Sequence, residues 1–276
     1  ISLLLFFTFL CSNDLSSKKI GLVLSGGGVK GFGHLGTLHL IDSLNIKVDY
    51  IVGSSIGAIT AALYATGHSI EEINQIALTT KWDEIFGIAQ KRKQLYYFNK
   101  QDSDNYQLSF SLENLKPIAP ISLSSGQYSY EHLSDIFINY SNAPNYDNLV
   151  IPFRCNATNL ITGEETIFKN GSIPKILRIS SSIPTVFSPL EHQNDLLVDG
   201  GLINNLPTNL AKDLGSDYII ASSVMSPEKS KDDINDVFSV VYRLINLYGE
   251  KNEAENIRKS DLLINPSFKT ISSINA

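Results

Sequence analysis

The sequence predicts an α/β fold, a three-layer α/β/α sandwich with a mostly parallel central sheet. Short apolar runs rich in β-branched residues alternate with helical patterns between Lys19 and Thr79. This rhythm of strand, helix, strand and helix is typical of parallel sheets covered by helices on both faces. Glycines follow the first two predicted strands, at the points where tight turns lead into helices.

The first elements follow from simple patterns. KIGLVLS at Lys19–Ser25 and VDYIVG at Val48–Gly53 are continuous apolar runs, which predict buried strands. Between them, Gly31–Leu44 carries leucine and isoleucine at helical spacing. The small residues of Ile56–Ala65 predict a closely packed helix. Ser69–Thr79 begins with serine followed by two glutamates, a typical helix start.

The rest of the chain continues the pattern with less regular spacing. Further strands are expected as two strands within Val150–Phe168 joined by the turn Asn159–Gly163, and at Leu196–Val198, Tyr218–Val224 and Asp261–Ile264. Further helices are expected at Tyr128–Tyr140, Ile173–Ile179, Leu206–Leu214 and Asp233–Arg258. No internal repeat or low-complexity segment interrupts the sequence.

Composition indicates a globular protein that does not bind nucleic acid. The chain has 276 residues, of which 43% are hydrophobic and 18% charged, and its net charge is -6. This length suits one large α/β domain or two small ones, and the composition is that of a globular protein. A chain with this charge is a poor candidate for neutralising the phosphates of DNA or RNA.

The sequence divides into three parts. Residues 1–17 begin with the apolar run Ile1–Leu10, which has the length of a signal-peptide core and predicts an exported protein, the alternative being a buried first strand. Residues 18–265 are expected to form the folded domain, and residues 266–276 the start of a linker to a further region. Removal of the leader near Cys11 would leave Cys155 as the one remaining cysteine, so no intramolecular disulfide is expected.

A serine motif follows the second predicted strand. Residues 53–57 (GSSIG) match G-x-S-x-G, in which a serine lies on a sharp turn from strand to helix with its hydroxyl exposed. Glycines two positions before and after remove side chains that would collide in this turn. The motif therefore predicts Ser55 as the nucleophile of an acyl hydrolase.

A glycine-rich loop follows the first predicted strand. It reads Gly26, Gly27, Gly28, Val29, Lys30 and Gly31. In a parallel sheet the carboxyl ends of neighbouring strands meet at one edge, so this loop and Ser55 are expected to converge. Its backbone amides would then stabilise the oxyanion of a tetrahedral intermediate, with Gly27 and Gly28 as main donors, Ile56 as a further one and Lys30 as a nearby positive charge.

The same loop leaves a second interpretation open. Gly26, Gly28 and Gly31 satisfy G-x-G-x-x-G, and Asp49 follows at about the distance of a ribose-binding carboxylate, so a dinucleotide site is the alternative. Against it, Asp49 precedes the second strand, whereas that carboxylate should follow it. A Walker-type phosphate loop is excluded because Lys30 precedes glycine rather than serine or threonine.

Three residues are candidates for the base that activates Ser55. Asp199 ends an apolar strand and precedes two glycines, and a carboxylate in a partly dry site has a raised pKa and accepts a proton directly from serine. His34 lies beside the glycine loop, and His192 lies near Asp199. The residues alone leave the choice open, and they also allow Asp199 to be a simple turn residue.

Taken together, the three ordered motifs resemble the patatin-like phospholipase family. The glycine loop, the Ser55 motif and Asp199–Gly201 (DGG) are similar to the oxyanion, nucleophile and aspartate motifs of that family, and Ser180–Pro189 is similar to a segment ahead of the aspartate. The similarity spans roughly Lys18–Val224. Lys30 and Ser54 stand where many relatives have arginine and threonine.

The resemblance implies a patatin-like fold and a Ser55–Asp199 dyad without a catalytic histidine. It implies hydrolysis of lipid acyl esters, with no metal and no organic cofactor. Resemblance to exported bacterial members, in which such a domain precedes an outer-membrane barrel, further implies a periplasmic or outer-membrane location. The alternative within this fold is a catalytically inactive binding module.

A lipid substrate also raises the question of membrane contact. Lys91, Arg92 and Lys93 lie next to the apolar and aromatic stretch Leu95–Phe98, which would suit contact with a membrane surface. The same stretch is also typical of a solvated charge run beside core aromatics. The sequence does not distinguish a phospholipase from a lipase or thioesterase, nor does it give the oligomeric state.

Overall fold

The computed structural model describes residues 17–85, 111–113, 116–118, 122, 124–142, 145–224 and 237–266. Most of the predicted leader, the stretch Lys91–Phe98 and all but the first residue of the predicted linker lie outside these ranges. Within them, no helix is both long enough and apolar enough to span a bilayer.

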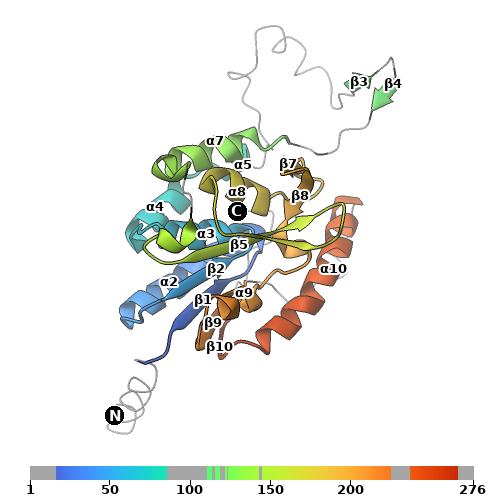
Figure 1. The fold of residues 1–276 in the computed structure, drawn as a ribbon. Helices are drawn as coiled ribbons and strands as arrows, with labels where there is room; N and C mark the ends of the chain where they lie inside the picture. Colours follow the sequence, from blue (N-terminus) through green and yellow to red (C-terminus); the bar gives the residue numbers. More distant parts are fainter. Residues whose placement is uncertain are drawn as a thin grey trace.

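A central eight-stranded sheet organises the fold (Figure 1). Its strand order is β10-β9-β1-β2-β5-β8-β7, with β6 paired to β5. The strands are β1 (Ile20–Leu24), β2 (Tyr50–Gly53), β5 (Phe153–Asn159), β6 (Glu165–Phe168), β7 (Leu190–His192), β8 (Asp195–Asp199), β9 (Tyr218–Ser222) and β10 (Leu262–Ile264). A separate antiparallel pair joins β3 (Ser111–Glu113) to β4 (Lys116–Ile118).

The sheet is parallel from β10 to β5 and antiparallel beyond. The predicted mostly parallel α/β architecture is therefore confirmed. Sequence patterns missed β7, a three-residue edge strand whose alternation is too short to recognise. The antiparallel direction of β8 was also not predicted.

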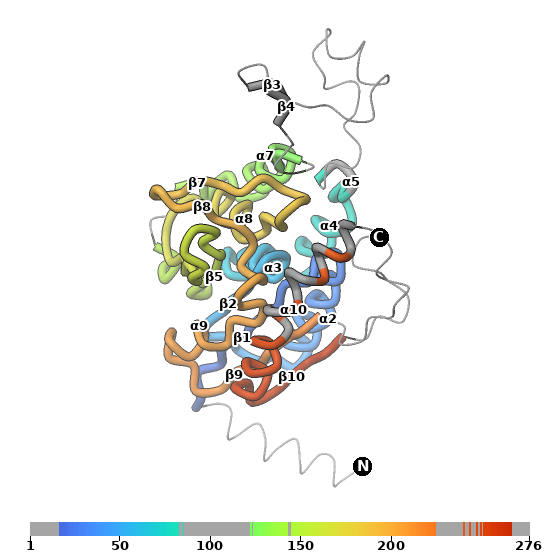
Figure 2. Tube along the Cα trace, turned by 90° about the vertical axis from the view of Figure 1, so that its right-hand side faces the viewer, coloured from blue at the N-terminus to red at the C-terminus, as the bar shows by residue number. Residues whose placement is uncertain are grey.

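Helices cover both faces of the sheet (Figures 1 and 2). They are α2 (Gly33–Ser43), α3 (Ile56–Ala65), α4 (Ile70–Thr79), α5 (Trp82–Ile85), α7 (Gln127–Ile136), α8 (Ile173–Ser180), α9 (Thr208–Asp213) and α10 (Val237–Ile257), with 3-10 turns η1 (Gly28–Phe32), η3 (Ile138–Tyr140), η4 (Tyr146–Asn148) and η5 (Gly200–Leu202). The helix predicted from Gly31 thus starts as the 3-10 turn η1 and becomes α2 at Gly33.

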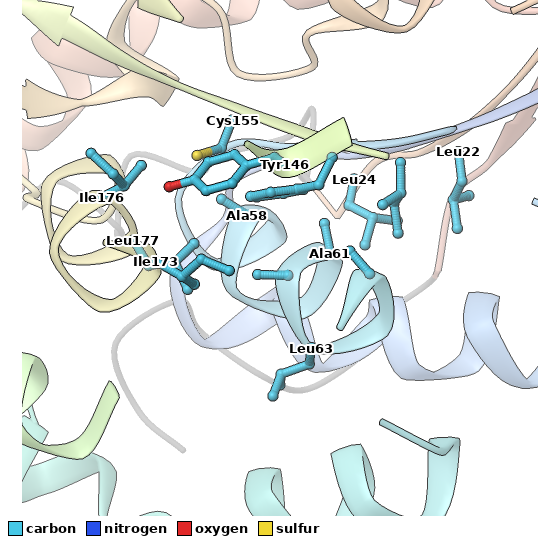
Figure 3. Packing of buried hydrophobic residues seen from close by; sticks show 14 of the residues in the cluster. Leu22, Leu24, Ala58, Ala61, Leu63, Tyr146, Cys155, Ile173, Ile176 and Leu177 are labelled. Atoms are coloured by element: carbon cyan, nitrogen blue, oxygen red, sulfur yellow. The ribbon is translucent and has the colours of Figure 1, made fainter. Parts of the chain in front are cut away.

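Alternating side chains of the central strands form two cores. In β1, Leu22 and Leu24 join the larger cluster with α3 and α8, while Val23 faces the opposite side. The larger core is shown in Figure 3, where Ala58 and Ala61 of α3 pack beneath the sheet. On the other face, Val23 packs in one cluster with Leu206, Leu210 and Ala211 around α9. This alternation makes the fold a three-layer sandwich.

Strand register brings two distant segments to the same level. Gly53 of β2 pairs with Cys155 of β5, and Ala157, two residues further along β5, pairs with Asp199 of β8. Ser55 lies two residues beyond Gly53. The end of β8 therefore lies level with Ser55, although β8 runs against β5.

Candidate active site

Ser55 occupies a strained corner between β2 and α3. Its backbone has φ 53° and ψ −124°, a conformation that non-glycine residues rarely adopt. A Cβ on Gly53 would collide with the backbone of Gly57, and one on Gly57 would collide with the carbonyl of Leu24. The two motif glycines are therefore required because the chain approaches itself too closely for any side chain.

The corner opens directly into the amino terminus of α3. Ser55 is the N-cap residue, and its hydroxyl caps no helical amide. The first amides of a helix, here those of Ile56 and Gly57, have no partner within the helix and lie at its positive end. Negative charge that develops beside Ser55 is thus stabilised by the helix.

The Ser55 hydroxyl donates a hydrogen bond to Asp199, with 2.6 Å between Ser55 Oγ and Asp199 Oδ2. The other carboxylate oxygen, Oδ1, accepts the amide of Gly201 at 2.8 Å. Ser55 is 5% exposed and Asp199 6%. The structure thus brings together the two residues that the motifs singled out, from positions 144 residues apart.

Burial determines the basicity of Asp199. Desolvation raises the pKa of its carboxyl to about 6, against the opposing effect of the hydrogen bonds from Ser55 and Gly201. Asp199 is therefore ionised at neutral pH, and it is a stronger proton acceptor than an ordinary aspartate. An acceptor with this pKa and this contact is suited to take the proton of Ser55.

The carboxyl end of α8 and the residues after it hold both members of the pair. Ser180 Oγ accepts the amide of Ser55 at 3.2 Å, and the carbonyl of Ser182 accepts the amide of Asp199 at 3.0 Å. The similarity noted over Ser180–Pro189 therefore includes residues that touch the backbone of both partners.

A buried arginine anchors this segment. Arg178 is 1% exposed and donates to Ser182 Oγ and to the carbonyls of Ser125 and Gly126. Burial lowers its pKa to about 10, so the guanidinium stays charged at neutral pH. Its cationic group lies 4.6 Å from the ring centroid of Phe187. Arg178 thus ties α8 to the residues that begin α7.

The glycine loop lies against Ser55, but only some of its residues line the pocket. Gly28, Gly31 and Ile56 line the same pocket as Ser55, and Gly28 has the positive φ of 57° that favours glycine. Gly26 packs against Ser55 and Gly27 against Val224. Lys30 is half-buried on η1 and does not line the pocket. Gly28 and Ile56 are therefore the best-placed of the predicted oxyanion donors.

An apolar pocket extends from Ser55. On α3, Ile56, Ile59, Thr60 and Leu63 line it along successive turns of the helix. The opposite walls come from η1, α2, α4, α5 and the segment after α8. They are almost entirely hydrophobic, and their apolar side chains are Val29, Phe32, Leu35, Ile73, Ile76, Ala77, Trp82, Ile85, Ile183 and Phe187. The edge of the Phe32 ring meets Trp82, with centroids 5.2 Å apart. Such an apolar lining is suited to hydrocarbon.

His34 has a role other than that of a base. It is fully buried, and its Nε2 lies 2.8 Å from the carbonyl of Ser25 while Nδ1 lies 2.9 Å from Ser222 Oγ. A carbonyl only accepts, so Nε2 carries the proton and Nδ1 accepts from Ser222. Burial lowers the pKa of His34 to about 4. The imidazole therefore stays neutral and joins β1, β9 and α2 beneath the glycine loop.

His192 and the remaining histidines also lie apart from the serine. His192 belongs to the edge strand β7 and meets the Phe168 ring edge to face at 5.6 Å. Among the hydrogen bonds of the described residues, none joins a histidine to Ser55 or Asp199. The geometry therefore favours Asp199 over both histidines.

Asp49 does not fit the dinucleotide alternative. It precedes β2, at the opposite edge of the sheet from the glycine loop, where it accepts the amide of Ile20 and pairs with Lys47 at 2.6 Å. Across the described ranges, no group of three His, Cys, Asp or Glu side chains is arranged to hold a metal ion.

Sequence patterns missed a polar cluster behind the site. Asn205 follows the Asp199–Gly201 turn and donates to Glu253 of α10, while Asn252 and Asn256 of α10 bond the neighbouring residues Ile203 and Asn204. The available signal was the spacing of Asn252, Glu253 and Asn256 on one face of a helix that also carries Gly249. A polar face on a helix normally indicates contact with solvent. The sequence pattern therefore did not predict that these side chains are buried.

Most of the chain is similar in sequence to known proteins. Residues 22–212 match the family model described as patatin-like phospholipase. The chain is 32% identical over 217 residues to Neuropathy target esterase sws of Drosophila melanogaster, covering 78% of the chain and 13% of that protein. It is 28% identical over 246 residues to Lysophospholipase NTE1 of Pyricularia oryzae, covering 88% of the chain and 14% of that protein.

Among solved structures, the chain resembles VipD from Legionella pneumophila with a TM-score of 0.44 and 15% identity, over 78% of this chain and 51% of that one. The chain spans about one seventh of the length of the curated relatives named above.

Proposed function

The chain belongs to the patatin-like phospholipase family, and from this premise we propose that it is a serine hydrolase of lipid acyl esters that uses a Ser55–Asp199 dyad. The observation that carries the proposal is the 2.6 Å hydrogen bond from the Oγ of Ser55, which lines an apolar pocket, to the buried carboxylate of Asp199. Neither a histidine nor a metal is needed for the proton transfer.

Acylation proceeds through the dyad. Asp199 accepts the proton of Ser55 as Ser55 Oγ attacks the acyl carbonyl carbon. Negative charge moves to the carbonyl oxygen, where the amides of Gly28 and Ile56 stabilise it; one such donor typically accounts for about 10²–10³ in rate. Collapse of the intermediate breaks the ester C–O bond, and Asp199 returns the proton to the departing alcohol.

Deacylation repeats these steps with water. Asp199 takes a proton from the water as its oxygen attacks the acyl-Ser55 carbonyl, and the same amides stabilise the second oxyanion. Breaking the Ser55 ester bond releases the fatty acid, and the proton returns to Ser55 Oγ. The dyad is then ready for another cycle.

The apolar lining of the pocket favours a substrate that is recognised by its hydrocarbon acyl chain. From Ser55, the N-cap of α3, the lining continues along the helix to Leu63, eight positions and about 12 Å along the helix axis. Ile59, Ile73 and Trp82 among its walls offer no charge to a polar substrate. We propose a monoacyl phospholipid as the substrate class, in line with the lysophospholipase names of the relatives.

Covalent labelling tests the proposed nucleophile. A fluorophosphonate probe should modify the wild-type chain at Ser55, as mapped by peptide mass spectrometry, and the wild type should release fatty acid from a monoacyl phosphatidylcholine. Ser55→Ala should abolish both signals. His192→Ala is the matched control and should retain them. Labelling at a different serine, or full hydrolysis by Ser55→Ala, would refute the dyad.

Location is a separate proposal. The apolar run Ile1–Leu10 and the resemblance to exported bacterial members support export to the periplasm or outer membrane. Contact of Leu95–Phe98 with a membrane surface is proposed on the same basis of sequence pattern. Cell fractionation of the tagged chain, with and without residues 1–17, tests export, and retention in the cytoplasm in both cases would contradict it.

A further inference from the structure

Behind the glycine loop, one amide side chain lies between the two turns that form the site. Asn205 is 6% exposed. Its backbone carbonyl accepts the amide of Gly26 at 3.1 Å, and its side-chain Nδ2 donates to the carbonyl of Gly26 at 3.3 Å. Both the backbone N–H and the carbonyl of Gly26 are therefore hydrogen-bonded to the same residue.

The same side chain also contacts the aspartate turn. A Cβ added to Gly201 would lie 2.6 Å from Asn205 Oδ1, and a Cβ added to Gly26 would collide with the same atom. Gly201 in turn donates its amide to Asp199. Asn205 thus fills the space between the loop that carries the oxyanion donors and the turn that carries the base.

A buried carboxylate fixes the orientation of Asn205. Glu253 of α10 is 4% exposed, and its Oε2 accepts Asn205 Nδ2 at 2.9 Å. Its Oε1 accepts Ser223 Oγ at 2.5 Å, at the end of β9. Both carboxylate oxygens therefore have defined donors, and an amide that donates to a fixed carboxylate has little rotational freedom.

Close packing of α10 makes this arrangement rigid. A Cβ on Gly249 would lie 2.5 Å from the carbonyl oxygen of Gly201, so the helix backbone lies directly on the aspartate turn. Asn252, one helical turn after Gly249, donates to the carbonyl of Ile203 at 2.7 Å. The contacts of Gly249 and Asn252 therefore fix the part of α10 that carries Glu253.

We propose that Asn205, oriented by Glu253, is a positioning residue that sets the glycine loop relative to Ser55 and Asp199. Neither residue touches the reacting atoms. Asn205 acts through Gly26, which lies two residues before Gly28, the oxyanion donor of the loop that lines the pocket. The inference rests on the proposed hydrolase function, and it assigns that reaction a residue outside the three sequence motifs.

Kinetics of Asn205→Ala test the inference. A misplacement of about 1 Å in a catalytic group typically costs about a hundredfold in rate. We expect kcat for monoacyl phosphatidylcholine to fall roughly ten- to hundredfold with KM within about twofold of wild type. Asn256→Ala is the matched control, because Asn256 is 7% exposed and bonds Asn204 rather than the glycine loop. It should lower the melting temperature and leave kcat near wild type.

A second pair of variants tests the role of Glu253 and guards against misfolding of Asn205→Ala. Glu253→Ala removes the acceptor of Asn205 and should lower kcat by a similar factor. Glu253→Gln keeps one acceptor oxygen for Asn205 Nδ2 and should recover most of the lost kcat. Equal kcat in Glu253→Ala and Glu253→Gln, or equal loss in Asn205→Ala and Asn256→Ala, would overturn the inference.

The outcomes separate the inference from the function on which it rests. If wild type is active and labelled at Ser55 while Asn205→Ala keeps kcat within twofold, the positioning role is wrong and the hydrolase stands. If wild type neither hydrolyses the substrate nor reacts with the probe, the proposed function fails, and the inference fails with it.

Discussion

Ser55–Asp199 and Ser223–Glu253 are both buried pairs in which a serine hydroxyl donates a short hydrogen bond to a carboxylate oxygen. The oxygen–oxygen distances are 2.6 Å and 2.5 Å, and the four side chains are all between 3% and 6% exposed. Both pairs adjoin residues that contact the glycine loop. By distance and burial alone, neither pair is distinguished as the catalytic one.

Backbone and surroundings distinguish them. Ser55 has a positive φ at the start of α3 and lines the apolar pocket, whereas Ser223 directly follows the extended strand β9 and does not line the pocket. Asp199 is the last residue of β8 and precedes a glycine turn, and Glu253 is held within the long helix α10. A short serine–carboxylate bond becomes a catalytic dyad only where the hydroxyl also faces a substrate cavity and oxyanion donors.

The largest expected effect is on ester hydrolysis. Ser55→Ala removes the nucleophile, and we expect kcat/KM for a short-chain acyl ester to fall at least about 10⁴-fold. Ser223→Ala removes only a support of Glu253, and its loss should stay below about tenfold. Steady-state assays on both folded variants measure the contrast. A comparable loss in both would mean that the two pairs are not functionally distinct.

The pH dependence of catalysis should report Asp199. Its pKa is raised to about 6 by burial, and only the ionised carboxylate accepts the Ser55 proton. We therefore expect kcat/KM to be constant above pH 7 and to fall about tenfold for each pH unit below 6. A profile measured between pH 4.5 and 8, with folding checked by circular dichroism, tests this. An acid limb near pH 4 would show that the carboxylate of the free enzyme is solvated and its pKa is not raised.

Substitution of Asp199 and substitution of Glu253 should change the free energy of unfolding in opposite directions. The folded pKa of Asp199 lies above its ordinary value of 3.8, so its contribution to stability is favourable at low pH and is lost as the pH rises through 6. The shift corresponds to at most about 3 kcal/mol. Asp199→Asn removes this cost, so its free energy of unfolding should exceed that of wild type at pH 8 and approach it at pH 4.

Glu253→Ala is the counterpart. It leaves Asn205 Nδ2 and Ser223 Oγ without this acceptor, at about 1–3 kcal/mol for each buried group. The free energy of unfolding from urea titrations should therefore fall. If Asp199→Asn also destabilised the protein at pH 8, the catalytic carboxylate would be a structural support like Glu253.

The first strands of the central sheet and the corner that carries Ser55 were predictable because they depend on local pattern. Continuous apolar runs gave β1 and β2, and the glycines of residues 53–57 gave the corner on which Ser55 lies. Asp199 was recognisable as one of three candidates for the base. Its contact with Ser55 depends on the register of β2, β5 and the antiparallel β8, which no local pattern contains.

The support behind the site was not predictable for the same reason. Asn205 and Glu253 are 48 residues apart, and the polar face of α10 follows the usual pattern of a solvated helix. The packing of Gly249 on the aspartate turn and the burial of Glu253 and Asn256 show that this face is covered. His34 illustrates the reverse case, since a histidine beside a glycine loop suggested a base and the structure shows a neutral structural residue.

The smallest expected effect concerns the pocket, which only the Ser55 pair adjoins. Leu63 lines it two helical turns from Ser55 and points away from the sheet (Figure 3). Leu63→Ala should lengthen the cavity and shift the preferred acyl chain upward by a few carbons, with kcat/KM ratios between long and short esters rising about tenfold, as expected for small changes in a hydrophobic pocket. A series of esters of increasing chain length measures the shift.

Leu210→Ala is the control, because Leu210 is similarly buried but belongs to the core on the opposite face of the sheet, beside α9. Both substitutions create a cavity and should lower stability by about 2–5 kcal/mol. Only Leu63→Ala should change chain-length selectivity. An equal change in both variants would mean that selectivity follows global loosening of the fold, and the acyl chain would then lie elsewhere than along α3.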